Sequence, residues 1–437
     1  MNNRLLAALH KTWPPIGPME IKGRPKGSIK TVRHDPDRLR QKVIYVEHSI
    51  DPGQFEAADR DNACWILHLV QQHHRVKNLA SSRSVPLAQK YLKPMLTYKH
   101  QQAALALLIE RGIIERRPSE GRCAYYGFTT PYQSDRYIPH EITATRLLDR
   151  LYKHQLERES SLRLPVHRRL YSLLERIAAT PDAPDDAALD AIRRGNLWAS
   201  VCDKGRFHST LTRLPKEFRS HIRIEGYDDL VTSDVSHCQF VLLACWLQAQ
   251  GIAVDAEFKI DAIAGGLYHR FGEAVGCKRD RNKAKKRIIS TLFGYPRERK
   301  YNPKYVEAFS LLYPHTWAAV DAYVRSAPAA NLACVLQRYE STVMIEGAAA
   351  AFTEQYPDVP LLTLHDGFVV PRAFADEATR CITDAFRTLC GVVPTVKIDK
   401  FESKPGKRTR RLEREKRVEL RNRRRIQAVV SVVPQSP

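Results

Sequence analysis

Two aspartates, Asp234 and Asp366, lie on either side of a basic segment at residues 281–294. Each follows a short apolar run, so each is expected to lie at the end of a β-strand. If the fold brings the two strands together, the carboxylates could hold two divalent cations about 3.5 to 4 Å apart. The basic segment would then offer positive charge to an anionic group at the same site. This order restricts the fold strongly, because strands from distant parts of the chain have to meet.

Each aspartate also has an ordinary interpretation. Asp234 stands between a predicted strand at residues 230–233 and a predicted buried helix that starts near Phe240, where a lone aspartate usually caps the helix. Asp366 lies in an apolar stretch that predicts a β-hairpin with His365 and Asp366 at its tip. A His-Asp pair also occurs in metal-dependent phosphohydrolases, but on a helix. Other residues have to decide between these interpretations.

The basic segment predicts a helix with a functional side. Arg281, Lys285, Ile289 and Phe293 are four residues apart, so they share one side of a helix. Arg281 and Lys285 could neutralise phosphate groups, and Phe293 could stack on a base or pack against a sugar. The alternative is an amphipathic helix with a basic solvent face, because three neighbouring positions are also charged: Lys283, Lys286 and Arg287.

The charge of the chain points to a polyanionic partner. The sequence has 70 Lys and Arg against 48 Asp and Glu, a net charge of +22, and nucleic acid is the expected partner. No apolar run approaches the roughly 18 residues of a membrane span, and the N-terminus has no apolar signal region. We therefore expect a cytoplasmic protein without a membrane partner. The nine cysteines contain no Cys-x-x-Cys pair, so neither a zinc knuckle nor a disulfide framework is expected.

Composition and periodicity divide the chain into five expected parts. These are a flexible basic arm, a winged-helix-like domain, a helical region, a catalytic core and a basic tail, at residues 1–57, 58–132, 133–200, 201–402 and 403–437. In the arm, Gly23-Arg24-Pro25 resembles an AT-hook, with a plain basic linker as the alternative. The tail would add phosphate contacts, because twelve Lys and Arg face three Glu between residues 404 and 425.

The winged-helix-like domain is predicted from a helix followed by a hairpin. Residues 103–112 form an apolar helical pattern that ends at a glycine, and residues 113–117 and 123–128 predict a strand and its return. Arg116, Arg117 and Arg122 would form a basic wing for nucleic acid. A purely structural role for the hairpin is an equal alternative.

Four segments, in this order, resemble the superfamily of bacterial family A DNA polymerases and phage-type single-subunit RNA polymerases. Lys204-Gly205-Arg206 resembles the Thr-Gly-Arg segment, and Asp234-Val-Ser-His-Cys-Gln is similar to motif A, Asp-Tyr-Ser-Gln-Ile-Glu. Arg281-x3-Lys285-x7-Phe293-Gly294 has the spacing of motif B, Arg-x3-Lys-x7-Tyr-Gly, and Leu364-His365-Asp366-Gly367 is similar to motif C, Val-His-Asp-Glu. A weaker match is a predicted helix from residue 337. The resemblance covers less than half of the 437 residues.

The resemblance implies an α+β fold with a right-hand polymerase palm, helical fingers and a thumb-like region at about residues 140–198. It also implies template-directed nucleotide addition with two Mg²⁺ ions, or Mn²⁺, from nucleoside triphosphates. The implied metal ligands are Asp234, Asp366 and the Val235 carbonyl. The implied substrate contacts are Arg281, Lys285, Gln239, Ile289 and Phe293 for the nucleotide, with Lys285 also able to protonate pyrophosphate, and Arg206, Gln337 and His365 for template and primer.

Three positions depart from the family pattern. Gln239 stands where the DNA enzymes have Glu and the RNA enzymes have Gly, and Phe293 replaces the motif B Tyr, which together favour deoxynucleotides. Gly367 replaces the motif C Glu, so that acid is missing. No Asp-x-Glu exonuclease signature precedes the motifs, so proofreading is not expected. The resemblance therefore implies a small polymerase from a mobile element, and two alternatives stay open. One is a non-catalytic winged-helix DNA-binding protein, such as a plasmid replication initiator. The other is a polymerase fold that has lost its activity through these three departures.

Overall fold

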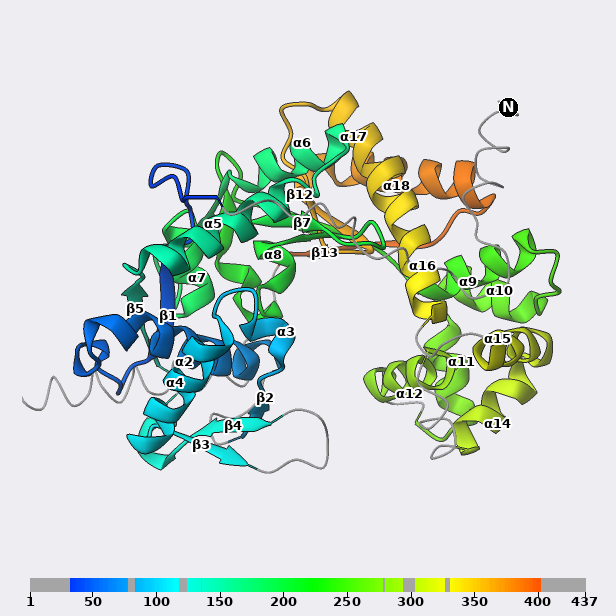
Figure 1. Ribbon diagram of the computed structural model, residues 1–437. Coiled ribbons are helices and arrows are strands. Elements are labelled where there is room, and N and C mark those ends of the chain that lie inside the picture. Colours follow the sequence, from blue (N-terminus) through cyan, green and yellow to red (C-terminus); the bar gives the residue numbers. More distant parts are fainter. Residues whose placement is uncertain are drawn as a thin grey trace, which may run out of the picture.

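The computed structural model describes residues 32–77, 83–117, 124–134, 136–277, 280–293, 303–326 and 331–401. The AT-hook-like segment, Arg122, Gly294 and the basic tail lie outside the described residues. Three groups of buried apolar side chains organise the described part into an N-terminal unit, a small middle group and a large core around a four-stranded sheet. Figure 1 shows the N-terminal unit and a helical lobe on opposite sides below this sheet.

The N-terminal unit combines helices with two small antiparallel sheets (Figure 1). One sheet has the strand order β2-β4-β3, and the other pairs β1 with β5. The predicted helix begins earlier than expected, at Tyr98, because the Thr97 side chain accepts a hydrogen bond from His100 N and caps it. The predicted hairpin is present, with Ile114 opposite Phe128. The elements are β1 (Val43–Glu47), η1 (Pro52–Gln54), α2 (Ala57–Lys77), β2 (Val85–Pro86), α3 (Gln89–Leu92), α4 (Tyr98–Glu110), β3 (Ile114–Arg117), β4 (Tyr125–Phe128), η2 (Thr130–Tyr132), β5 (Tyr137–Glu141) and α5 (Thr145–Glu159).

This unit begins before residue 58 and continues past residue 132, unlike the sequence-based division. Ile44 and Val46 of β1 are fully buried, so the expected flexible arm does not reach residue 57. Leu147 and Leu151 of α5 join the same core. The four-residue spacing of these leucines puts them on one face of the helix, but spacing alone does not say which neighbour an apolar face will cover.

The sequence predicts an all-helical region at residues 140–198, and this prediction is wrong. Strand β6 interrupts it and pairs with β9, with Ile177 opposite Ile224. Leu170 and Leu173 of α6 pack in the large core, whereas the leucines of α5 belong to the N-terminal unit, so the region is shared between two cores. The elements here are α6 (Pro165–Leu174), β6 (Ile177–Ala179), α7 (Ala187–Arg193), β7 (Ala199–Val201), β8 (Phe207–Ser209), α8 (Thr210–Arg213), η3 (Lys216–His221) and β9 (Ile222–Ile224).

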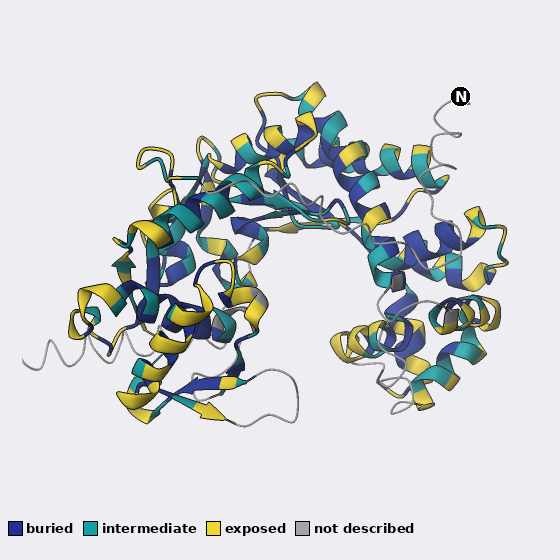
Figure 2. Cartoon of the chain, viewed as in Figure 1, coloured by how far each residue is buried: buried dark blue, intermediate teal, exposed yellow. Residues whose placement is uncertain are grey.

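The central sheet is antiparallel, with the strand order β11-β12-β10-β13. Helix α18 and the π-helix η4 pack together over the sheet, and α9 is buried along almost its whole length, from Cys238 to Leu247. Figure 2 shows buried residues concentrated where the sheet meets its covering helices. The elements are β10 (Leu230–Val235), α9 (Cys238–Ala249), β11 (Leu362–Thr363), β12 (Gly367–Pro371), η5 (Arg372–Phe374), α18 (Ala375–Cys390) and β13 (Val396–Lys400).

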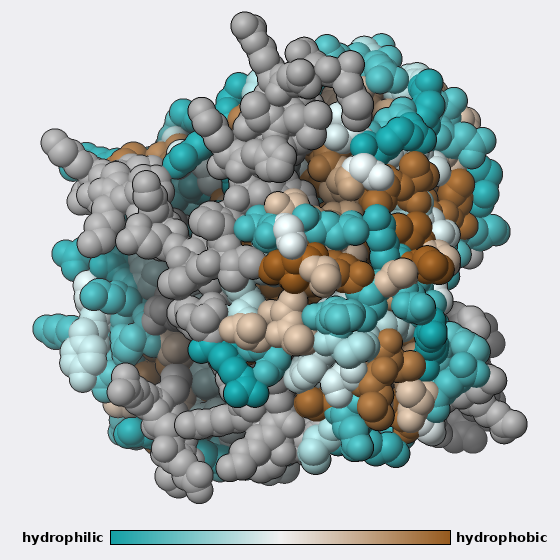
Figure 3. Space-filling view, turned by 90° about the vertical axis from the view of Figure 1, so that its right-hand side faces the viewer, coloured by the Kyte–Doolittle hydropathy of each residue, from teal (hydrophilic) through white to brown (hydrophobic). Residues whose placement is uncertain are grey.

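The helical lobe lies between β10 and β11 in the sequence. The chain returns from the lobe to the central sheet through α16 (Asn331–Ser341), η4 (Thr342–Ala349) and α17 (Ala350–Gln355). The lobe itself consists of α10 (Ala256–Ala264), α11 (Leu267–Ala274), α12 (Arg281–Phe293), α14 (Pro303–Leu312) and α15 (Pro314–Ser326). Ile260 and Leu311 are strongly exposed on it. Figure 3, which looks onto this side of the molecule, shows apolar surface in patches separated by hydrophilic surface. None of the helices in the described ranges has the length and apolar character of a membrane span.

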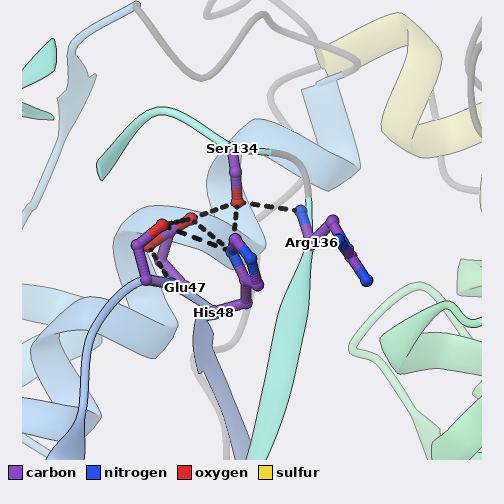
Figure 4. Close-up of polar contacts among 5 residues, drawn as sticks. Glu47, His48, Ser134 and Arg136 are labelled. Atoms are coloured by element: carbon purple, nitrogen blue, oxygen red, sulfur yellow. Dashed lines mark hydrogen bonds and ion pairs between the residues drawn. The ribbon is translucent and has the colours of Figure 1, made fainter. Parts of the chain in front are cut away.

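A Ser-His-Glu cluster at the end of the β1–β5 pair holds the N-terminal unit together (Figure 4). Glu47 is fully buried and accepts hydrogen bonds from Ser49 N, at 2.8 Å, and from the Ser134 hydroxyl. His48 Nδ1 lies 3.0 Å from the Ser134 hydroxyl oxygen. A nucleophilic triad needs histidine to bridge serine and carboxylate through its two nitrogens. Here serine donates directly to the carboxylate, so the cluster is structural.

A second buried carboxylate connects α2 to the start of α5. Asp61 accepts hydrogen bonds from Thr143 N, at 2.7 Å, and Ala144 N, at 2.6 Å, and its other oxygen lies 2.7 Å from His140 Nε2. Burial alone would raise the pKa of Asp61, but the bonds from His140 and the two backbone amides outweigh it, and the pKa is lowered. The ionised form therefore stabilises the fold.

This lowered pKa predicts a pH dependence of stability. A depressed folded-state pKa contributes stability above the unfolded pKa of about 3.9, and this contribution is lost as the pH falls through the folded value. We expect the difference in unfolding free energy between the wild type and Asp61→Asn to shrink below about pH 4. Urea unfolding from pH 3 to pH 7 measures it, and a difference that stays constant over this range contradicts the assignment.

Candidate active site

Asp234 lies within β10 and faces solvent. It is paired with Gly367 of β12 on one side and with Lys397 of β13 on the other. The helix that follows is capped by His237, whose φ of 58° is left-handed, and not by Asp234. The ordinary interpretation of this aspartate as an N-cap is therefore wrong. Its carboxylate is left without the role that a lone aspartate usually has at such a junction.

Asp366 lies at the tip of the predicted β-hairpin, between β11 and β12. Leu364 N donates to Gly367 O at 2.8 Å, and His365 adopts a left-handed φ of 61° to make the turn. Val235 N donates to Asp366 O at 3.0 Å, which ties the tip to the end of β10. The His-Asp pair thus lies in a turn. In the metal-dependent phosphohydrolases the pair lies on a helix, so the structure does not favour that alternative.

Gly367 allows the two aspartate-bearing strands to approach closely. A Cβ at this position would lie 2.9 Å from Asp234 Oδ1 and 2.9 Å from Ser233 O, closer than real Cβ atoms come. In the sequence, Gly367 stands where motif C has Glu, so it indicated only the loss of an acidic residue. The structure gives a positive reason for glycine, because a side chain here would push β10 and the hairpin apart.

The electrostatics place the two carboxylates and Lys285 at one site. Burial, and next the nearby charge of Asp366, raise the pKa of Asp234 to about 7. Solvent still reaches Asp234, although protein surrounds much of its carboxylate. Burial also raises the pKa of Asp366, and the charge of Lys285 opposes both shifts. Two acids that repel each other in this way are stabilised by any added positive charge.

The donor set suits an ion that needs few protein ligands. Within the described ranges, no group of three or more His, Cys, Asp or Glu side chains could hold a metal ion. Mg²⁺ is usually bound through one or two carboxylates together with substrate phosphates and water. The carboxylates of Asp234 and Asp366 fit this pattern, and the Val235 carbonyl is the predicted further ligand.

Helix α12 carries its basic residues on an exposed side. Arg281 and Lys285 are exposed, whereas Ala284 and Ile288 are buried against the large core. The Arg281 guanidinium carbon lies 5.1 Å from the centroid of the Tyr268 ring, and Lys285 Nζ lies 5.9 Å from it. Both cations therefore lie within cation–π distance of the Tyr268 ring on α11.

The remaining predicted positions of α12 lie further along the helix. Ile289 is 37% exposed, and Phe293 is partly buried with its ring centroid 5.8 Å from that of Phe240. The four residues therefore follow one partly exposed stripe, as their spacing predicts. Contact of Ile289 and Phe293 with a nucleotide remains a prediction.

Three residues from distant segments meet in a buried polar network. Arg206 Nη2 lies 2.6 Å from Glu340 Oε1, and Gln239 Nε2 donates to Glu340 Oε2. The Glu340 side chain is 3% exposed. Burial raises its pKa to about 7, while Arg206 lowers it and the charge of Asp366 raises it further. Glu340 therefore lies within electrostatic reach of the aspartate pair.

Two histidines and a further arginine complete the surroundings of the aspartate pair. The rings of His365 and His208 are 5.7 Å apart. Burial, and next Arg206, lower the pKa of His365 to about 4, so its ring is neutral at pH 7. Arg219 is partly buried, and this burial lowers its pKa, although the charge of Asp234 opposes the shift. Gln337, the weakest predicted contact, is half-buried on α16, one turn before Glu340.

Sequence reasoning missed Glu340 and Tyr268. Glu340 had a usable signal, because it lies four residues after Leu336 on the apolar stripe of α16, where an acid is unexpected. Tyr268 had none, because its role depends on how α11 packs against α12.

The comparisons with known proteins give a likeness to solved structures and nothing at the level of sequence. No protein-family model and no curated protein sequence matches the chain. Among solved structures, the chain is similar to the POL domain of Pol1 from M. smegmatis in complex with DNA primer-template and dNTP, with 14% sequence identity and a TM-score of 0.25. The match covers 80% of this chain and 66% of that chain, just under two thirds. A likeness at this level decides neither the fold nor the activity.

The close approach at Gly367 predicts a low tolerance for any side chain. We expect Gly367→Ala to lower the unfolding free energy by about 1 to 3 kcal/mol, because the added methyl group overlaps β10. Gly391→Ala is a poor control, since that glycine has a left-handed φ of 67°. Gly266→Ala is better, because its nearest neighbour is 3.5 Å away. Equal urea midpoints for the two variants would contradict this packing.

The repulsion between the two carboxylates predicts a gain in stability when one is neutralised. In EDTA at pH 8, we expect Asp234→Asn to raise the unfolding free energy by about 1 kcal/mol after allowance for solvent screening. Added Mg²⁺ should raise the wild-type melting temperature more than that of the variant. Asp358→Asn, an exposed acid elsewhere, should behave like the wild type. A destabilised Asp234→Asn protein would overturn this account of the pair.

Proposed function

We propose that this protein is a template-directed nucleic-acid polymerase without proofreading exonuclease, with deoxynucleotides favoured. The observation that carries the proposal is the pairing of β10 with the hairpin, which brings the Asp234 and Asp366 segments together. The charge of Lys285 supports it, because it lowers the pKa of both aspartates against the effect of burial. The net charge of +22 supports a nucleic-acid partner. The chemical class is nucleotidyl transfer.

In the proposed reaction, a primer 3′-hydroxyl oxygen attacks the α-phosphorus of a nucleoside triphosphate. A new oxygen–phosphorus bond forms, and the bond to pyrophosphate breaks. Asp234 and Asp366 would hold two Mg²⁺ ions, which would activate the hydroxyl and neutralise the leaving group. Arg281 and Lys285 bind the β- and γ-phosphates, and Lys285 donates a proton to the leaving pyrophosphate.

Three residues are assigned to contacts with the template and primer. Arg206 contacts the primer or template, and Gln337 contacts the minor groove near the primer end. His365 is neutral at pH 7 because burial and Arg206 lower its pKa to about 4. It therefore contributes hydrogen bonds and no charge to this contact.

A second candidate function rests on the N-terminal unit. This unit has its own apolar core and its own antiparallel sheet beside α4. A winged-helix-like domain of this kind could bind duplex DNA without any catalysis, as a plasmid replication initiator does. Polymerisation is favoured, because a non-catalytic protein has no use for two repelling carboxylates beside Lys285.

Primer extension tests the proposed function. We expect wild-type protein with Mg²⁺ to extend a labelled primer, and Asp234→Asn and Asp366→Asn to lose at least about 10³-fold in rate, because each removes a ligand that both ions need. Lys285→Ala should lose about 10- to 100-fold. Primed and unprimed templates of DNA and RNA, with dNTPs or NTPs, identify the substrate.

The matched control lies on the same helix. Lys286 is exposed, neighbours Lys285 and is assigned no contact, so Lys286→Ala should extend the primer at close to the wild-type rate. Synthesis that survives both aspartate substitutions would refute the assignment of the pair. Specific duplex binding by the intact chain, without incorporation on any template, would favour the second candidate.

A further inference from the structure

One buried carboxylate holds two residues with different predicted roles. Glu340 lies on α16, between the predicted motif B and motif C segments, and none of the family patterns above includes it. One of its oxygens contacts Arg206, a predicted primer or template contact, at 2.6 Å. The other accepts a hydrogen bond from the amide of Gln239, on which sugar choice was predicted to depend.

The network is costly, so packing alone does not explain it. Glu340 is 2% exposed, and its helix neighbours Leu336, Tyr339 and Val343 are buried in the large core. Burying a carboxylate is unfavourable, and replacing a buried ion pair with hydrophobic residues of similar volume often leaves a protein as stable or more so. What a buried ionic group can add is a fixed geometry for its partners.

The backbone around Arg206 is also fitted to α16. Gly205 has a left-handed φ of 74°, and a Cβ there would lie 2.9 Å from Arg338 Nη1 and 3.2 Å from Ser341 Cβ. The turn that presents Arg206 therefore packs directly on the helix that carries Glu340. The Arg206 Nε–H is buried and has no hydrogen-bond partner among the described residues, so it remains available as a donor.

The charge of Glu340 fixes which end of the Gln239 amide it holds. The Gln239 amide NH₂ group donates to one carboxylate oxygen, and the contact of Arg206 with the other oxygen favours the ionised form, which only accepts hydrogen bonds. The amide oxygen of Gln239 is therefore turned the other way. Gln239 is the second residue of α9, close after Asp234, and is partly buried. Without Glu340 the amide would be free to rotate by 180° and exchange its donor for its acceptor.

We propose that Glu340 is a positioning residue for substrate choice, which holds Gln239 in the one orientation that discriminates between deoxyribose and ribose. Glu340 acts through Gln239 and does not itself touch the nucleotide. At the same time it ties Gln239 to Arg206, so that the sugar contact and the primer contact form one unit. This inference rests on the proposed polymerase function, because it assigns specificity to the same site.

The test measures nucleotide binding separately from chemistry. A template-primer that ends in a dideoxynucleotide forms a complex with the protein and Mg²⁺ but cannot be extended. The dissociation constants of dATP and ATP opposite thymine then give a selectivity ratio for each variant. We expect the wild type to prefer dATP, and Glu340→Gln to reduce this preference about tenfold, the effect of one misplaced hydrogen bond.

Two further variants separate positioning from general damage. In Gln239→Ala the residue that Glu340 orients is gone, so adding Glu340→Gln should change the ratio no further. Glu346→Gln is the matched control, because Glu346 is exposed on η4, which continues the same helix. It should keep the wild-type ratio. Urea midpoints verify that each variant is folded.

Each outcome decides the inference. A Glu340→Gln ratio within about twofold of wild type, or equal effects of Glu340→Gln with and without Gln239, overturns the positioning role. A wild type that binds neither nucleotide, or binds both equally, overturns it as well. If the complexes show the expected selectivity but an extendable primer is never lengthened, the polymerase function fails while the role of Glu340 stands.

Discussion

The pairing of β10 with the β11–β12 hairpin is the constraint on which the rest of the site depends. It sets Asp234 opposite Gly367 and bonds the backbone of Val235 to that of Asp366. Because the facing position has no side chain, the carboxylates of two distant segments can share one place. The two buried carboxylates repel each other, so positive charge nearby stabilises their ionised forms. Lys285 supplies part of that charge, but the pKa of each aspartate is still raised.

Around this pair, the fold arranges positive charge on two sides. Helix α12 brings Arg281 and Lys285 over Tyr268 on one side. The segment before β8 brings Arg206 to Glu340 on the other, next to the neutral His365. A nucleotide and a nucleic-acid strand are both polyanions, so this division suits a site that has to hold the two at once.

The sequence predicted the local elements well, and it predicted the order in which the site residues occur along the chain. The strand before Asp234, the hairpin around Asp366 and the exposed stripe of α12 all follow from short-range patterns of apolar and charged residues. Features that depend on the partner of an element could not be predicted. The leucines of α5 and α6 have helical spacing, which defines an apolar face on each helix but does not show that the two faces join different cores. Glu340 and Tyr268 have meaning only once α16 and α11 are packed in place.

The most direct test of the central claim is to locate the metal. Crystals of the wild type grown with Mn²⁺, a non-hydrolysable nucleotide and a template-primer would give an anomalous signal at each bound ion. The account predicts a peak within coordination distance of both Asp234 and Asp366, and its loss in Asp366→Asn. An ordered nucleotide with no ion at this pair, or ions held elsewhere in the protein, would contradict the account.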